Sequence, residues 1–323
     1  MNRNRTGAIA VVGLAALSMA ACNRGPAESA GGADNANNVT IGLAVANLQA
    51  DFFNQIKQSV EAEAKKTGAT VRVSDAGGDA ATQVNQIQDF ITRQVDVIIY
   101  IPAGATAAGV PVKAAKRAGI PVVAVDRNAP DAPGDTFIAT DSVAAAKTLG
   151  DWVAKASGGK GNLAILQGQI GTTPQVDRQK GFSQALSAHP GIKVVAQQPA
   201  DWAQDKAFSV AQDMLQAKPD INIFWGQADA MALGAAQAVR NANVKQKVII
   251  AGFDGDIAGL KAVRAGQIDA TMVQQTQAMG RLAVKSALDL AAKKKLPATQ
   301  LQQAFLLTKT DTKKADEYIA QHP

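Results

Sequence analysis

Polar and aromatic side chains come directly after several predicted strands of this 323-residue chain. Ligands of open parallel sheets bind beyond the carboxyl ends of the strands, so we expect these side chains to converge. The first half of the chain supplies Gln49, Phe52, Phe53, Asp126 and Arg127. The second half supplies Trp202, Asp254 and Gln274 after strands, and Arg178 within a helical segment.

The residue types in this set indicate what they would bind. A carboxylate accepts hydrogen bonds from two neighbouring hydroxyls, and a guanidinium donates to two oxygens. The aromatic rings of Phe52, Phe53 and Trp202 offer flat apolar faces. Together these groups suit a neutral polyhydroxyl ring, which is polar around its edge and carries C–H groups on its faces.

Each residue also has a local interpretation. Phe52 and Phe53 could pack as a staple at a helix start, and Trp202 could pack on the surface. Asp126 and Arg127 could form a local ion pair, and Asp254 could cap the following helix.

Asp229, which precedes Ala230-Met231-Ala232-Leu233, is interpreted as a helix cap rather than a ligand residue.

Catalytic and metal signatures are not evident. His189 precedes a proline and His322 is next to the last residue, so neither histidine is placed for acid–base chemistry. No Cys/His metal spacing occurs, and Gly158-Gly159-Lys160-Gly161 lacks the spacing of a phosphate-binding loop. Asp126 and Asp254 could form a glycosidase pair, but no flanking motif favours hydrolysis. The sequence therefore predicts a binding protein, not an enzyme, without metal or cofactor.

Apolar β-branched runs alternate with helical segments from Val39 onward, which is typical of parallel sheets with helices on both faces. Strands are predicted at 39–45, 70–73, 95–101, 121–125, 137–139, 163–166, 194–197, 221–225, 248–252, 270–273 and 304–307. Helices are predicted at 53–66, 80–93 and 105–118, and from near Ser142, Pro174, Gln204, Ala230, Ile257 and Gln277. So many strands predict two similar α/β halves, the second beginning near Thr140-Asp141.

The N-terminus has the pattern of an export signal. Arg3 and Arg5 precede a short uncharged run, and Met19-Ala20-Ala21-Cys22 supplies small residues at the cleavage point. The only cysteine stands where bacterial lipoproteins carry their lipidated first residue, so 1–21 is predicted to be a signal peptide and Cys22 a lipid attachment site. The alternative is an ordinary signal peptide with Cys22 incidental. Residues 22–38 are polar and small, as in a flexible tether.

Composition narrows the possibilities further. Removal of residues 1–21 would leave 302 residues, enough for two ordinary domains, with no cysteine besides Cys22. The net charge of +6 falls to +4 without Arg3 and Arg5, and the remaining excess is spread among many acidic residues. A nucleic-acid partner is therefore not expected.

Six segments in this order resemble the ribose-type periplasmic sugar-binding proteins, the receptors of ABC importers, over about Thr40 to Leu307. They are Asp51-Phe52-Phe53, Gly119–Arg127, Asp177-Arg178-x-x-Gly181-Phe182, Pro199–Trp202, Asp229–Gly234 and Gly252–Gly255. The resemblance implies a type I periplasmic binding protein fold, with two doubly wound parallel-sheet domains joined by a hinge. It implies one domain of 39–140 and 275–303, and a second of 141–274 and 304–323.

The resemblance also implies roles for individual residues. Phe52 and Phe53 would lie on one face of the sugar and Trp202 on the other, while the hydroxyls would be bound by Asp126, Arg127, Arg178, Asp254 and Gln274. Three positions where the ribose receptor has asparagine differ, since this chain has Ala50, Ile101 and Ala228. A buried hydroxyl without a partner costs roughly 1–3 kcal/mol, which disfavours ribose itself.

The resemblance implies a monomer in the periplasm that delivers a cyclitol or monosaccharide to an ABC permease of the inner membrane. The expected ligand is myo-inositol, a choice drawn from inositol receptors among the ribose-type relatives. Ribose, another pentose or a hexose is the alternative, and so is ligand presentation to a chemoreceptor or in quorum signalling. Transcription repressors that share this core carry an N-terminal helix-turn-helix, whose place is taken here by the signal and linker.

Overall fold

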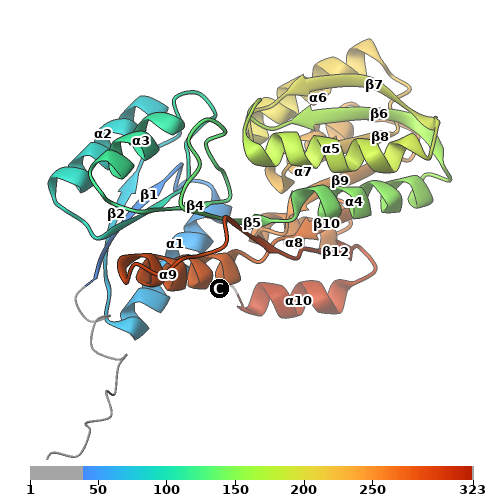
Figure 1. Cartoon of the computed structure of the whole chain (residues 1–323). Helices are drawn as coiled ribbons and strands as arrows, with labels where there is room; N and C mark the ends of the chain where they lie inside the picture. The colour runs from blue at the N-terminus through green and yellow to red at the C-terminus, as the bar shows by residue number, and fades with distance from the viewer. Residues whose placement is uncertain (1–38, 322–323) are drawn as a thin grey trace, which may run out of the picture. The chain divides into compact units, whose positions relative to one another are not determined.

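A computed structural model describes residues 39–321 of the chain. The predictions of a signal peptide at 1–21, a lipid on Cys22 and a linker at 22–38 lie outside these residues. Within the described range the chain forms twelve strands and ten helices, which alternate except where β5 directly follows β4 and β12 directly follows β11 (Figure 1). None of the helices in that range is long and apolar enough to span a bilayer.

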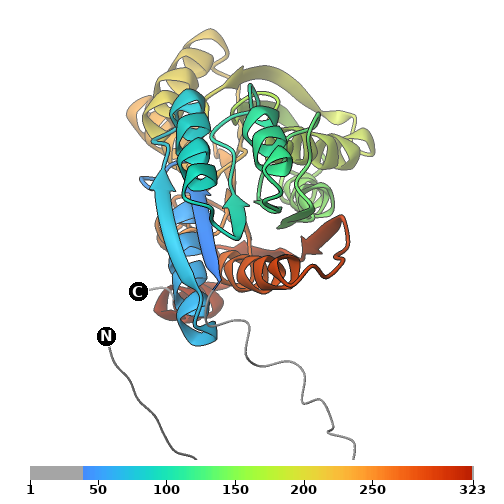
Figure 2. The same cartoon turned by 60° about the vertical axis from the view of Figure 1, so that its left-hand side comes forward.

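The first sheet has six strands, all paired in parallel. Its order is β11 (Thr299–Gln302), β5 (Thr136–Thr140), β4 (Val122–Val125), β3 (Val97–Tyr100), β1 (Thr40–Val45) and β2 (Thr70–Asp75). Helices α1 (Asp51–Thr67) and α9 (Thr276–Ala291) lie side by side and pack against one face (Figures 1 and 2). Helices α2 (Ala80–Thr92) and α3 (Gly109–Arg117) cover the other face.

Burial on both faces explains the nearly continuous apolar run of β3. Ile99 packs into the core beneath α1 and α9, whereas its neighbours Ile98 and Tyr100 pack beneath α2 and α3. Because successive side chains of a strand point to opposite faces, a strand covered on both sides is apolar at every position.

The second sheet also has six strands. Its order is β12 (Phe305–Thr308), β10 (Ala270–Val273), β9 (Ile249–Asp254), β8 (Ile223–Gly226), β6 (Lys160–Gln167) and β7 (Gly191–Pro199). One face carries α4 (Ser142–Ala156) and α5 (Thr173–Ser187), and the other carries α6 (Gln204–Ala217), α7 (Asp229–Asn241) and α8 (Ile257–Arg264). Trp225 stacks on Phe182 of α5 with ring centroids 3.8 Å apart, inside the core.

Four features differ from the sequence predictions. Strand β11 was not predicted, nor was α10 (Thr312–Gln321), which contacts α8. Strand β12 pairs antiparallel with β10, so the second sheet is not purely parallel. Helix α3 begins at Gly109 rather than Ala105, because Ala107 has a left-handed backbone with φ of 60°.

The chain passes from one sheet to the other at three places. It leaves the first sheet after β5, returns to that side after β10 through α9 and β11, and leaves again for β12. Each sheet is therefore built from segments that lie far apart in the sequence.

Candidate functional site

A cavity of about 320 Å³ is lined by loops that follow strands of both sheets. Its lining includes Gln49 and seven of the eight residues expected to bind the ligand, namely Phe52, Phe53, Asp126, Arg127, Arg178, Trp202 and Asp254. The eighth, Gln274, does not line the cavity but hydrogen-bonds to a residue that does. Ligand contact by these residues stays a prediction.

Two phenylalanines form part of the cavity wall. Phe52 and Phe53 occupy the first turn of α1, with ring centroids 5.3 Å apart in an edge-to-face arrangement. Both belong to the core beneath α1 and both line the cavity. The pair therefore packs in the core at the start of α1 and also reaches the cavity, while its contact with a ligand stays a prediction.

Trp202 brings a third ring to the cavity from the turn after β7. Its indole lies against Gly168, at a point where any side chain on that residue would collide with the ring. The guanidinium carbons of Arg178 and Arg127 lie 5.4 and 5.8 Å from the indole centroid, within cation–π range.

Asp126 and Arg127 follow β4 and are both about 6% exposed. The Nε of Arg127 lies 3.6 Å from Oδ2 of Asp126, so the local ion pair is present. Nη1 of Arg127 also donates to the carbonyl oxygens of Pro102 and Ala103 at 3.1 and 3.2 Å. These carbonyls fix the guanidinium beside the cavity and the Phe53 ring.

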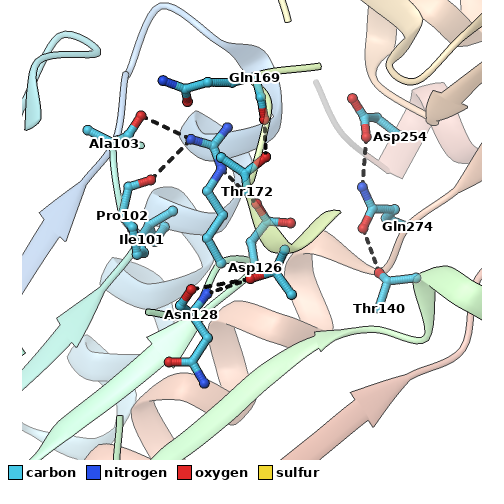
Figure 3. Close-up of polar contacts among 12 residues, drawn as sticks. Ile101, Pro102, Ala103, Asp126, Asn128, Thr140, Gln169, Thr172, Asp254 and Gln274 are labelled. Atoms are coloured by element: carbon cyan, nitrogen blue, oxygen red, sulfur yellow. Dashed lines mark hydrogen bonds and ion pairs between the residues drawn. The ribbon is translucent and has the colours of Figure 1, made fainter. Parts of the chain in front are cut away.

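Asp254 lies at the end of β9 and pairs with Arg178 of α5, with 3.0 Å between Oδ1 and Nη1. Gln274 donates to the same oxygen at 2.7 Å and accepts from the Thr140 hydroxyl at 2.6 Å (Figure 3). The cap of α8 is Asp256, whose carboxylate accepts from the Gly259 N–H. The interpretation of Asp254 as a helix cap is therefore wrong.

The interpretation of Asp229 as a helix cap is also wrong. The cap position of α7 is Ala228, and Asp229 is the first helical residue, with a fully buried side chain. Its two oxygens accept from the Gly255 N–H at 2.8 Å and the Thr271 hydroxyl at 2.6 Å.

Burial controls the protonation of the carboxylates at the cavity. Desolvation raises the pKa of Asp254 to about 7, although the Arg178 guanidinium opposes the shift. Desolvation also raises the pKa of Asp126, against the attraction of Arg127 and Arg178. Buried carboxylates of this kind are stabilised by hydroxyl groups that donate to their ionised form.

Three residues at the cavity hold backbone conformations that L-residues seldom adopt. The φ angles are 60° at Asp126, 68° at Trp202 and 124° at Asp254. Such strain collects at functional sites because the surrounding structure must impose it. No pattern in the sequence signals these angles.

Sequence reasoning missed several residues. Asp51, Gln204 and Asp256 line the cavity, and Gln227 stands behind it. The carbonyl of Gln227 accepts from Arg178, and its side-chain oxygen accepts from the Gly168 N–H at 3.0 Å. The one available signal was position, since these residues also follow strands or begin helices.

Of the three alanine or isoleucine positions noted in the sequence, two face the cavity. Ala50 and Ala228 line it, whereas Ile101 is fully buried in the core of the first sheet. The side chain of Ile101 therefore packs in the core and does not line the cavity.

Hydrogen bonds also join residues near the cavity whose elements belong to different sheets. The Ile257 N–H donates to Asp51 at 3.2 Å, and the Asn128 N–H donates to the Thr173 hydroxyl at 3.1 Å. Within residues 39–321 no group of three potential ligands is arranged to hold a metal ion.

A cavity lined by residues from two α/β sheets, with charged groups at strand ends and aromatic walls, defines a binding protein of the two-lobed periplasmic class. The periplasmic binding protein domain family matches residues 41–295, and the chain belongs to this family. The ribose import binding protein of Escherichia coli is 37% identical over 248 residues, covering 77% of this chain and 83% of that protein. The xylitol-binding protein of Mycolicibacterium smegmatis is 34% identical, covering 88% and 80% respectively.

A solved structure shares the fold closely. A solute-binding protein of an ABC transporter from Bacillus halodurans, determined with bound myo-inositol, has a TM-score of 0.82 and 28% identity. The match covers 90% of this chain and all of that one. Membership of the family implies an extracytoplasmic location.

Proposed function

We propose that the chain captures one cyclic polyol or monosaccharide in the cavity and delivers it to an ABC permease of the inner membrane. The observation that carries this proposal is the convergence of Asp126, Arg127, Arg178 and Asp254 with three aromatic rings around one space. The carboxylates would accept from ligand hydroxyls, the guanidiniums would donate to them, and the rings would cover the C–H faces.

The size of the cavity supports a small ligand. Its volume of about 320 Å³ lies at the lower end of the range for small-molecule sites, which runs from roughly 300 to 1,000 Å³. A single ring with its hydroxyls suits such a space better than a chain of sugars.

Our preferred ligand is myo-inositol, and ribose or another pentose or hexose is the alternative. The methyl groups of Ala50 and Ala228 and the broad face of Trp202 favour a six-membered ring. The inositol-bound neighbour supports this choice, and the ribose import binding proteins support ribose equally.

The same proposal includes the movement of two lobes and the attachment of the chain. The lobes would consist of residues 39–140 with 275–303, and of 141–274 with 304–323, closing on the ligand by a hinge motion. Cys22 would hold the protein to the membrane through a lipid, and residues 22–38 would act as the tether.

A thermal-shift screen of pentoses, hexoses and inositols tests the ligand. A ligand that binds only the folded state stabilises it by about 2.7 kcal/mol at a hundredfold excess over Kd. We expect myo-inositol to give the largest shift. No shift with any member of the panel would contradict the proposed function, and a larger shift with ribose would contradict the preferred ligand.

Calorimetry of alanine variants tests the site. Asp126→Ala and Asp254→Ala should each weaken binding of the best ligand, since every hydroxyl left unpaired costs roughly 1–3 kcal/mol. Asp79→Ala is the control, because Asp79 caps α2 and does not line the cavity. Equal affinities for Asp254→Ala and Asp79→Ala would exclude this cavity as the binding site.

A further inference from the structure

Asp229 is a buried carboxylate that the proposed binding site leaves unexplained. Its side chain is fully buried and does not line the cavity, so it cannot touch a ligand held there. It nevertheless lies behind the loop that carries Asp254, which does line the cavity.

The loop after β9 needs an external restraint. Asp254 has a φ of 124° and the next residue, Gly255, has a φ of 70°. Positive φ costs an aspartate free energy, so the Asp254 conformation persists only where contacts impose it, whereas glycine adopts positive φ without strain. The Gly255 N–H donates to Oδ2 of Asp229 at 2.8 Å, which fixes the peptide that directly follows Asp254.

The other oxygen of Asp229 is fixed as well. Oδ1 accepts from the hydroxyl of Thr271 on β10, the strand next to β9. Gly252 of β9 and Gly259 of α8 provide the room, because a Cβ on either residue would collide with this carboxylate. Asp229 thus joins α7, β10 and the loop after β9 at one point.

A carboxylate suits this place because both of its neighbours donate hydrogen bonds to it. An ionised aspartate presents two acceptor oxygens, whereas asparagine presents one acceptor and one donor. In the asparagine variant either Gly255 or Thr271 would face an N–H₂ group.

We propose that Asp229 is a positioning residue of the binding site, which sets the Asp254 carboxylate through the Gly255 peptide. This inference rests on the proposed function, in which Asp254 accepts from a ligand hydroxyl. Loss of Asp229 would let the loop relax toward commoner φ angles. The Asp254 carboxylate would then lose its ion pair with Arg178 and its hydrogen bond from Gln274.

A matched control, Asp269, lies just before β10, the strand that carries Thr271. Asp269 is a buried aspartate that accepts from the Ile250 N–H at 2.9 Å and from Lys309 at 2.6 Å. It joins the start of β9 to the residue just before β10, whereas Asp229 joins the loop after β9 to Thr271 within β10. A purely structural effect of losing a buried aspartate from this sheet should appear equally in both.

Affinity for D-ribose and for myo-inositol is measured by calorimetry for Asp229→Ala, Asp229→Asn and Asp269→Ala, with melting temperatures alongside. We expect Asp229→Ala to weaken binding roughly tenfold or more and Asp229→Asn to recover part of the loss. Asp269→Ala should lower the melting temperature without changing affinity. If Asp229→Ala does not fold, Thr271→Val is used in its place. That variant removes the Thr271 hydroxyl, which is one of the two groups that donate to the Asp229 carboxylate.

A measurement without ligand separates the two proposals. The ligand-free crystal structure of Asp229→Asn is compared with that of the unmodified protein. An Asp254 whose φ has moved toward commoner values, and whose contacts with Arg178 and Gln274 are broken, supports positioning even if neither sugar binds, an outcome that would count against the proposed function alone. An Asp254 that keeps its φ and both contacts, or equal affinity losses in Asp229→Ala and Asp269→Ala, would overturn the inference.

Discussion

Replacing Asp254 by asparagine should make the ligand-free protein more stable at pH 8 and a weaker binder. The side chain is 12% exposed and forms an ion pair with Arg178 inside the cavity. Asparagine has nearly the same shape, and its oxygen can still accept from Arg178 and Gln274. The substitution therefore changes the charge with little change in packing.

The magnitude follows from the pKa. Burial raises the pKa of Asp254 from 3.8 to about 7, so the folded protein binds this proton more tightly than the unfolded chain does. The free energy of unfolding consequently falls as the pH rises from 3.8 through 7. At pH 8 the ionised carboxylate costs the folded state about 4 kcal/mol relative to a neutral group.

The attraction of Arg178 is already part of that value, because it opposes the shift caused by burial. Asp254→Asn should thus raise the free energy of unfolding at pH 8 by up to about 4 kcal/mol, and by much less at pH 5. Affinity should fall roughly tenfold or more, because a hydrogen bond to a charged acceptor contributes about 1.5–3 kcal/mol.

Urea unfolding at pH 5 and pH 8, and calorimetry at pH 8, measure both effects. Asp79→Asn is the control of opposite sign, since backbone hydrogen bonds at the α2 cap lower the pKa of Asp79. That control should lose stability at pH 8. A stability change in Asp254→Asn that is the same at both pH values would refute the argument from charge burial, and unchanged affinity would refute the role in binding.

Three further predictions concern Gly168, Asp254 and Cys22. Gly168→Ala should displace the Trp202 indole and weaken binding roughly tenfold, as seen by calorimetry and tryptophan fluorescence, and unchanged spectra and affinity would contradict the packing described. Ligand binding at pH 7 should release up to about half a proton from Asp254, because hydroxyls that donate to the carboxylate lower its pKa. Calorimetry in buffers of different ionisation enthalpy measures the number of protons released, and proton uptake would contradict the prediction. Cys22→Ser should abolish lipid labelling, whereas labelling that persists, or release of the unmodified protein as a soluble chain, would show that Cys22 is not the anchor.

The class of fold was predictable because its signals are local. Strands buried on both faces read as continuous apolar runs, such as the one that contains β3, and the helices between them carry regular apolar spacing. Strand β11 escaped prediction because its residues, Thr-Gln-Leu-Gln, are largely polar and the strand lies at the edge of its sheet. The antiparallel direction of β12 has no local signal at all.

The candidate site was predictable in outline for a similar reason. Residues that follow parallel strands share one edge of a sheet, so position in the sequence was enough to bring Asp126 and Asp254 into one list. Their neighbours Asp229 and Asp256 follow strands too, and composition does not distinguish the four. Only the structure shows that Asp256 caps α8 and lines the cavity, that Asp229 is buried and does not line it, and that Asp126 and Asp254 line it without capping a helix.

Local sequence patterns predicted the strands and helices other than β11 and α10, and they showed which polar and aromatic residues stand at the strand ends. Tertiary structure alone decided the partners: Arg178 with Asp254, and Thr140 with Gln274 across 134 positions of the chain. It also decided the protonation of Asp254, since that depends on how much water the surrounding elements exclude. Local structure follows from near neighbours along the chain, whereas the environment of a side chain is formed by residues that folding brings together from distant segments.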